Sequence, residues 1–359
     1  NNTAIGFNSL SAFSTASYNT AVGYNCMGGS SGTTGQRNTM MGRYTGHAIT
    51  TGSYNSGFGM EALYAVTTGG YNTAVGYYAA NTITTGAYNI AIGYESMISA
   101  DVAASYNTCV GLYTGRLVSG SDNTFLGYAA GYDGVTSNEE VFVGHRAGQL
   151  RTAGGANTFV GSNAGYAAGT GASNTGIGRR AGYNLTTGYA NTMLGQGSGE
   201  AVTSGYINTF IGHSAGNNVT SGANVTCVGY NAKPPSNSST NTIVLGDASI
   251  TSLQCAQTTI SGLSDKRDKT NIKDSEYGLN IIDSLRPVTF DWNQREGGRE
   301  GLKDLGFIAQ DLQKVDDKHL NLVNDENPER LLAAYGRLIP VLVKSIQELK
   351  AEIDILKNK

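Results

Sequence analysis

The stretch Asn72-Thr73-Ala74-Val75-Gly76 is one unit of a repeat that fills residues 1–246 of this 359-residue chain. The pattern Asn-Thr-x-apolar-Gly recurs in fifteen units, and 11 of the 14 spacings between their glycines are 17 residues. Asn stands four residues before the glycine in 12 units, and the residue directly before the glycine is apolar in all 15. The repeat glycines are Gly6, Gly23, Gly42, Gly59, Gly76, Gly93, Gly111, Gly127, Gly144, Gly161, Gly178, Gly195, Gly212, Gly229 and Gly246. A fixed short period of this kind indicates a repeat architecture.

Seventeen residues are too few for a helix pair or a propeller blade, but they suit one rung of a solenoid. Thr and the large apolar residues favour strands, while the recurring Thr-Thr-Gly, as at 67–69 and 84–86, favours turns. We therefore expect each rung to contain two short strands and two turns. Rungs stacked at about 4.8 Å would form a rod of roughly 70 Å. The predicted fold is an all-β shaft, either a β-solenoid or a β-prism of several intertwined chains.

Alternation along a strand predicts where the repeated side chains point. Thr73 and Val75 would share one face and Asn72 would lie on the other. Identical residues of successive rungs would then align as ladders, with Asn side-chain amides bonded from rung to rung. Each rung offers only one or two medium apolar side chains for burial, so a single solenoid would have a weak core. We therefore expect identical chains to associate side by side.

The chain contains 21 tyrosines, and many flank the repeat unit. Those before the Asn are Tyr18, Tyr54, Tyr71, Tyr88 and Tyr106, and those after the glycine are Tyr24, Tyr77, Tyr94, Tyr128 and Tyr230. We favour ladders packed at a contact between chains, and the alternative is stacking on the sugars of a glycan. A depolymerase would need paired carboxylates, and the adjacent Glu139 and Glu140 would point to opposite faces of a strand. We expect no enzymatic activity in the shaft.

Cysteines and histidines give no metal or cofactor pattern. Cys26, Cys109, Cys227 and Cys255 form no CxxC pair, and Cys109 and Cys227 take a position where other units carry Ala, Phe or Met. We interpret these two as core residues. His145 and His213 lie four units apart, too far for one metal ion, and are expected on the surface. No metal and no cofactor are predicted.

Charge and hydropathy exclude two further classes of partner. The net charge is -3 and the first lysine is Lys233, so the repeat region carries no basic patch for nucleic acid. No apolar run approaches the roughly 20 residues of a membrane span, so we expect no membrane insertion. The chain begins inside a repeat unit without a Met, and we expect an attachment module to precede it.

Composition changes abruptly near Leu263. The residues before it hold 17 of the 51 charged residues and 44 of the 50 glycines, although they make up 262 of the 359 positions. Such a shift predicts a domain boundary. The repeat lapses after Gly246, so we divide the chain into a shaft (1–246), a linker (247–263) and a C-terminal domain (264–359).

The C-terminal domain resembles the peptidase S74 family. The stretch Ser264-Asp265-Lys266-Arg267-Asp268-Lys269-Thr270-Asn271-Ile272 is similar to the opening motif of that family, the intramolecular chaperone domains of endosialidase tailspikes and other phage fibres, with a relative in the myelin regulatory factor of animals. Leu285–Trp292 resembles its Pro-x-x-Phe-x-Trp strand, and Gly306–Asp311 resembles its Gly-Phe-Ile-Ala-Gln-Glu signature with Asp for Glu. Tyr335–Leu349 resembles its closing helix. The shaft repeats are also similar to those of phage tail fibres and of trimeric autotransporter adhesin heads.

This resemblance implies a small α+β domain that assembles three chains, helps the upstream fibre to fold and then cuts itself off. Carried over, the scissile bond is Leu263–Ser264, with Ser264 as the nucleophile and Lys269 as the general base. A lysine can act as a base once burial leaves it neutral. Because the serine directly follows the bond, we expect an N-to-O acyl shift and then ester hydrolysis in a single turnover. The roles of Asp265, Arg267 and Asn271 stay open, and the stretch taken alone would be a solvated run of charges.

The last residues carry a second signal for association. Apolar residues alternate three and four apart, as do the a and d positions of a coiled coil: Leu332, Tyr335, Ile339, Leu342, Ile346, Leu349, Ile353 and Leu356. Pro340 should delay the helix, so its firm part is predicted from Val341 onward. Ile at a with Leu at d favours two strands, whereas the family is trimeric. We expect a homotrimer, since two heptads are short and the shaft can dictate the number of chains.

Together these patterns predict a segment of a phage tail fibre or tailspike, located in the virion. Its shaft would bind a receptor on the host surface, a glycan or an outer-membrane component. One alternative is a trimeric adhesin of the bacterial surface with the same self-cleaving chaperone. Another is a membrane-tethered transcription factor of the myelin regulatory type, which the sequence disfavours because it has neither a basic DNA-binding face nor a membrane span.

Overall fold

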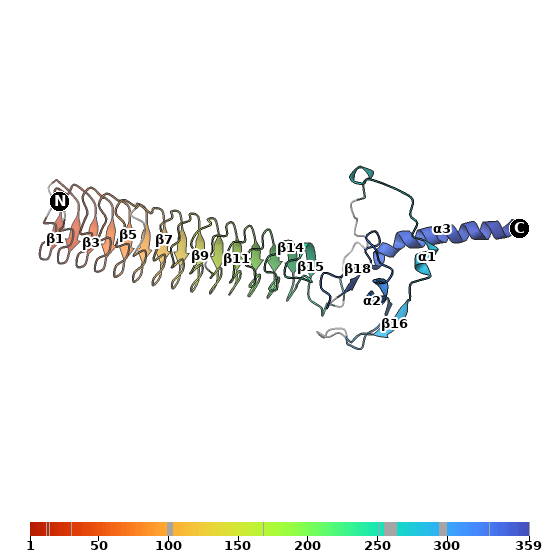
Figure 1. Ribbon diagram of the computed structural model, residues 1–359. Helices are drawn as coiled ribbons and strands as arrows, with labels where there is room; N and C mark the ends of the chain where they lie inside the picture. The colour runs from red at the N-terminus through yellow and green to blue at the C-terminus, as the bar shows by residue number, and fades with distance from the viewer. Residues whose placement is uncertain are drawn as a thin grey trace. The chain divides into compact units, whose positions relative to one another are not determined.

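The structure is a computed structural model, and it describes residues 1–359 except 12, 14, 30, 99–102, 168, 251, 255–263, 294–299, 330 and 359. The chain forms two compact units, Asn1–Asp247 and Ala248–Lys359. Short strands stacked along one axis make up the first unit, and the second contains short helices, two small sheets and a longer terminal helix (Figure 1).

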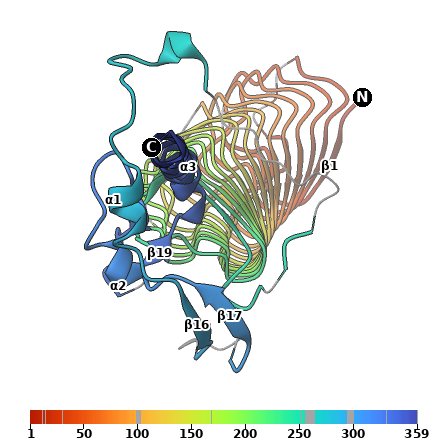
Figure 2. The ribbon, with the colours of Figure 1, turned by 90° about the vertical axis from the view of Figure 1, so that its right-hand side faces the viewer.

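The first unit is a parallel β-solenoid in a single chain. Its fifteen strands form one sheet in chain order, and each pairs in parallel with the next, as Thr73 pairs with Ile90. Successive rungs lie as nested loops when viewed along the unit (Figure 2). The strands are β1 (Thr3–Ile5), β2 (Thr20–Val22), β3 (Thr39–Met41), β4 (Ser56–Phe58), β5 (Thr73–Val75), β6 (Ile90–Ile92), β7 (Thr108–Val110), β8 (Thr124–Leu126), β9 (Val141–Val143), β10 (Thr158–Val160), β11 (Thr175–Ile177), β12 (Thr192–Leu194), β13 (Thr209–Ile211), β14 (Ala223–Val228) and β15 (Thr240–Leu245). This confirms the predicted solenoid of 17-residue repeats.

The expectation of two strands per rung was wrong, because each described rung contains one named strand. The rest of the rung closes through bends that use left-handed residues, such as Tyr71 at φ 59°, Tyr78 at φ 56° and Ala80 at φ 51°. Their backbone groups still bond between rungs, as the Tyr78 N–H donates to the Met60 carbonyl at 3.0 Å. Tight bends therefore satisfy the backbone without a second extended segment.

The repeat glycine is required by close approach of the backbones. Gly76 has φ +138°, and a Cβ there would lie 2.3 Å from the carbonyl oxygen of Gly93, the matching glycine of the next rung. A side chain cannot occupy that space, and L-residues rarely adopt that φ. The fourteen repeat glycines from Gly6 to Gly229 thus permit the rungs to stack at strand spacing.

The predicted asparagine ladder is present inside the solenoid. The backbone N–H of Asn72 donates to Asn55 Oδ1 at 3.0 Å, and its side-chain amide donates to the same oxygen at 3.1 Å and to the Gly86 carbonyl at 2.9 Å. Asn72 Oδ1 in turn accepts two hydrogen bonds from Asn89. The buried amides therefore join successive rungs, as the sequence predicted.

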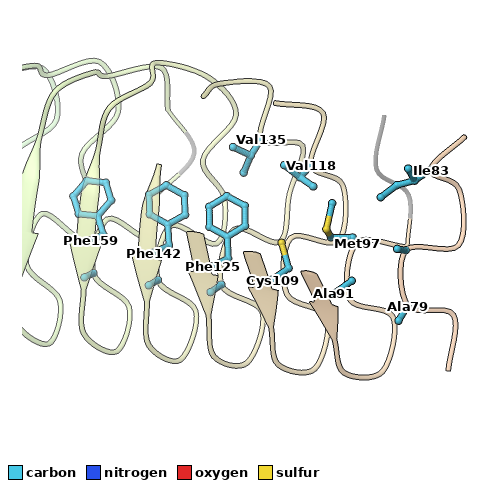
Figure 3. Close-up of a cluster of buried hydrophobic side chains, with 14 of the residues drawn as sticks. Ala79, Ile83, Ala91, Met97, Cys109, Val118, Phe125, Val135, Phe142 and Phe159 are labelled. Atoms are coloured by element: carbon cyan, nitrogen blue, oxygen red, sulfur yellow. The ribbon is translucent and has the colours of Figure 1, made fainter. Parts of the chain in front are cut away.

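The core lies on the asparagine side of the strand. Ala74 is buried with Asn72, whereas Val75 points outward. One rung buries Ala74, Ala79, Ala80 and Ile83, so the core is fuller than the one or two apolar residues expected. Figure 3 shows the consequence over several rungs, with Phe125, Phe142 and Phe159 stacked in the interior at centroid distances of 5.1 and 5.8 Å.

Cysteines and histidines of the first unit lie as predicted where the structure describes them. Cys109 and Cys227 are fully buried in the core, and burial raises the pKa of the Cys227 thiol to about 11. His145 and His213 are exposed and stack on neighbouring tyrosines. Cys255 lies outside the described residues.

Two buried charged residues of opposite sign interrupt the repeat. Glu140 takes the place of a ladder asparagine, and its carboxylate accepts from the Asn157 backbone N–H at 2.9 Å. Arg151 is fully buried two bends later, and its guanidinium donates to the Gly171 carbonyl. Burial raises the pKa of Glu140 and lowers that of Arg151, and each charge partly offsets the shift of the other. Glu139 is exposed, so the adjacent acids do point apart.

The second unit comprises η1 (Lys266–Asp268), α1 (Leu279–Ile282), β16 (Val288–Asp291), β17 (Lys303–Gly306), α2 (Ala309–Leu312), β18 (Val323–Asn324), β19 (Leu332–Ala333), η2 (Tyr335–Arg337) and α3 (Leu338–Lys357). β16 pairs antiparallel with β17, and β18 with β19. A small core around Leu312, Leu322 and Val341 joins α2, β18 and α3.

Helix α3 begins at Leu338, three residues before the expected Val341. Pro340 lies in its first turn, where the N–H that proline lacks would have no partner within the helix, so it is tolerated. Leu332 and Tyr335 fall in β19 and η2 instead, so the helical part of the predicted a/d series begins at Ile339.

Candidate functional site

The candidate site is a single turn at the start of the charged motif Ser264–Ile272. Asp265 caps the short helix η1, because its carboxylate accepts a hydrogen bond from the Arg267 backbone N–H at 2.8 Å. The Lys269 N–H then closes the turn onto the Lys266 carbonyl at 3.2 Å. Asp265 caps a residue only two positions further along the chain, so this capping needs no tertiary contact.

This turn brings together the two residues predicted as nucleophile and base. Lys269 Nζ lies 2.6 Å from Ser264 Oγ and 3.1 Å from the Ser264 carbonyl oxygen. The first distance is within the range over which a serine hydroxyl can pass its proton to an amine. Leu263, the predicted residue on the other side of the scissile bond, lies outside the described residues.

Asp265 and Arg267 form a second contact in the same turn. The Arg267 guanidinium donates to both Asp265 oxygens: Nε lies 3.1 Å from Oδ1 and from Oδ2, and Nη2 lies 2.6 Å from Oδ2. These bonds lower the pKa of Asp265 and raise that of Arg267. The pair braces the turn that returns Lys269 to Ser264. Asn271 follows with φ 55°, a left-handed conformation that asparagine tolerates, and redirects the chain.

Ser264 and Lys269 are both exposed in the single chain. Their contact is an arrangement of two side chains on an exposed turn, and a lysine acts as a base only in its neutral form.

Two more motif segments are tied together by one hydroxyl. Tyr335 Oη accepts from the Phe307 N–H at 3.1 Å and donates to the Phe307 carbonyl at 3.2 Å. A Cβ on Gly306 would lie 2.7 Å from this oxygen, so a larger residue there would displace the Tyr335 hydroxyl. Sequence reasoning placed Tyr335 in the heptad series and at the start of the segment that resembles the closing helix, and no local pattern points to its partner. Asp311, which replaces the family's Glu, pairs with Lys314 at 2.6 Å.

Helix α3 presents different residues to its own unit and to solvent. Leu338, Val341 and Ser345 are buried, and Glu348 accepts a hydrogen bond from the Leu279 N–H at 2.9 Å, at the start of α1. The six residues of the predicted a/d series that lie in α3 are instead exposed by 45–68%: Ile339, Leu342, Ile346, Leu349, Ile353 and Leu356. An exposed apolar stripe of this length indicates a surface for association.

The tyrosines of the shaft do form ladders. Tyr54, Tyr71, Tyr88 and Tyr106 stack at 4.7–5.0 Å with rings 4° apart. Both faces of Tyr71 and Tyr88 are therefore covered, while Arg37 lies over Tyr54. A sugar stacks on a ring face, so these rings offer a glycan their edges and hydroxyls.

No group of three or more potential metal ligands occurs in the described parts of the chain. None of its described helices is long and apolar enough to cross a membrane.

Comparison with known sequences identifies the C-terminal segment. Residues 264–321 match the peptidase S74 family, described as a chaperone of endosialidase. The match begins at Ser264 and includes the Ser264–Lys269 turn, α1, β16, β17 and α2, but it does not extend to α3. It supports a protein of the tail-fibre or tailspike type with an intramolecular chaperone, related to autoproteolytic peptidases and associated with the virion. No curated protein and no solved structure matches the chain.

Proposed function

We propose that this chain is a segment of a phage tail fibre or tailspike whose C-terminal unit assembles three copies and then cleaves the Leu263–Ser264 bond. The observation that carries the proposal is the 2.6 Å separation of Lys269 Nζ and Ser264 Oγ in a segment that matches an autoproteolytic family. The exposed stripe of α3 supports assembly through a parallel coiled coil. The shaft would then meet a receptor on the host surface.

The chemistry follows from the position of Ser264 directly after the bond. Neutral Lys269 takes the hydroxyl proton, and Ser264 Oγ attacks the Leu263 carbonyl carbon. The bond from that carbon to the Ser264 nitrogen breaks, and the nitrogen receives the proton as it leaves. Water then hydrolyses the ester, which gives a carboxylate at Leu263 and a free amino terminus at Ser264. No cofactor enters this sequence.

The test uses the full chain and intact-mass spectrometry. The parent should give fragments that end at Leu263 and start at Ser264, whereas Ser264→Ala should stay whole. Lys269→Arg should also stay whole, because arginine keeps the charge and the donor but is not deprotonated in proteins. Thr270→Ala and Lys266→Ala are matched controls, since they remove an exposed hydroxyl and an exposed amine of the same turn.

Two results would count against the assignment. Cleavage in Ser264→Ala would show that Ser264 is not the nucleophile. Cleavage of Lys269→Arg at the parent rate would show that Lys269 is not the general base. If all variants sediment with the mass of the parent assembly, loss of cleavage cannot be attributed to loss of folding.

A further inference from the structure

Fifteen apolar side chains form a line on the outside of the solenoid. This outer ladder consists of the residues directly before the repeat glycines: Ile5, Val22, Met41, Phe58, Val75, Ile92, Val110, Leu126, Val143, Val160, Ile177, Leu194, Ile211, Val228 and Leu245. Eleven of them are 37–60% exposed, and the other four, all valines, are half-buried. The core does not explain why all are apolar, because it is filled from the opposite face of each strand.

The neighbouring column of the same face is also uncharged. Two residues before each outer-ladder position stands Thr, Ser, Ile or Val in all fifteen rungs, as Thr73 stands beside Val75. Other outward columns tolerate charge: the position of Tyr71 is taken by Arg37, Asp122 and Glu139 in other rungs. A water-facing column is free to vary in this way, so the uniform face behaves as a covered surface.

The dimensions of this face fit an interface. Fifteen rungs at about 4.8 Å give a length of roughly 70 Å, and two columns spaced about 7 Å apart give a strip close to 10 Å wide. The resulting area of about 700 Å² per chain approaches the roughly 800 Å² that each partner contributes to a stable protein interface.

A partner that covers this face must present an uncharged row of side chains at the spacing of the rungs and over the same length. A second copy of this chain carries such a row, namely its own outer ladder. Association through α3 would join the copies with the same polarity, which places identical rungs at the same height. We propose that copies of the chain pack through the outer ladder, parallel and in register, so that Val75 of one copy faces Val75 of the next.

This inference rests on the proposed function. The outer ladder would provide a contact between chains that lies within the shaft itself. Cleavage at Leu263 would release the unit that carries α3, so the shaft needs another surface to hold its chains together. The outer ladder would supply it. The sequence instead favoured the tyrosines as the contact between chains, and the two faces can be told apart by experiment.

The test is cysteine cross-linking in the full chain. We would introduce Val75→Cys, Ile177→Cys and Ile211→Cys separately on the outer ladder, and compare Tyr71→Cys in the stacked tyrosines and Thr68→Cys in an exposed bend. After mild oxidation, most chains of the three ladder variants should run as covalent dimers on a non-reducing gel, because a disulfide requires Cα atoms within about 7 Å. Every chain carries Cys255→Ser, and the chain with no introduced cysteine is the blank, since the remaining Cys26, Cys109 and Cys227 are buried.

Dimers from Tyr71→Cys with none from the ladder variants would overturn the proposal and restore the tyrosine contact. So would an oligomeric parent in which no ladder cysteine cross-links, an outcome that leaves the proposed assembly and cleavage intact. A parent that sediments as a monomer would contradict both the outer-ladder contact and the proposed assembly of three copies. As a second measure, Val75→Lys combined with Ile177→Lys should dissociate the cleaved shaft in sedimentation velocity, while Thr68→Lys should not.

Discussion

Replacing one ladder asparagine tests what holds neighbouring rungs together. In Asn72→Ala the Asn89 backbone N–H loses its acceptor, and the Gly86 carbonyl loses a donor. Both groups are inside the solenoid and cannot reach water. A buried polar group left without a partner costs about 1–2 kcal/mol, so the two together should cost about 2–4 kcal/mol.

This loss should be local, and amide hydrogen exchange measures local opening. Each 1.4 kcal/mol changes an equilibrium tenfold, so amides of residues 55–89 should exchange roughly 30 to 700 times faster than in the parent. Peptides from residues 190–210 should exchange as before. Thr73→Ala is the matched control, because Thr73 is the next residue along the same strand but points outward.

Two outcomes would refute this reasoning. If exchange in residues 55–89 rose less than threefold, the ladder would not stabilise the stack. If Thr73→Ala accelerated exchange as much as Asn72→Ala, strand propensity rather than the buried amide would be responsible.

Four further predictions concern single features of the two units. Gly76→Ala should lower stability by about 2–4 kcal/mol in thermal unfolding, because the added Cβ meets a backbone carbonyl at a positive φ. Changing Glu140→Asn or Arg151→Leu alone should cost about 3 kcal/mol, while the double variant should be nearly neutral, since each single change leaves a buried charge without its partner. Because burial raises the folded-state pKa of Glu140, local stability there should fall as the pH rises from the ordinary glutamate pKa through the higher folded-state pKa, and Glu140→Gln should remove that fall. Tyr335→Phe should weaken the C-terminal unit by about 1 kcal/mol in denaturant titration, because it loses both bonds to Phe307.

Each of these has its own control. Gly134→Ala has a positive φ but open space, and it should cost only about 1 kcal/mol; an equal cost would exclude the clash. Additive effects of Glu140→Asn and Arg151→Leu would show that the charges do not interact. An unchanged pH profile in Glu140→Gln would assign the titration to another group. Tyr335→Phe with parent stability would make the hydroxyl bridge unimportant.

The sequence predicted the features that depend on local pattern. The 17-residue period, with a glycine such as Gly76 and an asparagine such as Asn72 in most units, predicted stacked rungs and a hydrogen-bonded ladder. Each rung makes the same contacts with its neighbours, so one unit represents the rest. The resemblance of the charged motif to the peptidase S74 family located the candidate dyad, and one capped turn brings Ser264 and Lys269 together. The roles of those two residues remain predictions until cleavage is measured.

The tertiary structure decided which face of each strand is buried, because the alternation of side chains along a strand does not. A strand pattern of period two separates Asn72 and Ala74 from Thr73 and Val75, but it does not state which pair faces the core. Closure of the rung through left-handed residues turned the asparagine side inward and left the apolar residue before each glycine outside. The electrostatic influence of Glu140 and Arg151 on each other and the contact of Tyr335 with Phe307 likewise depend on how bends and helices return through space, which spacing along the chain does not encode.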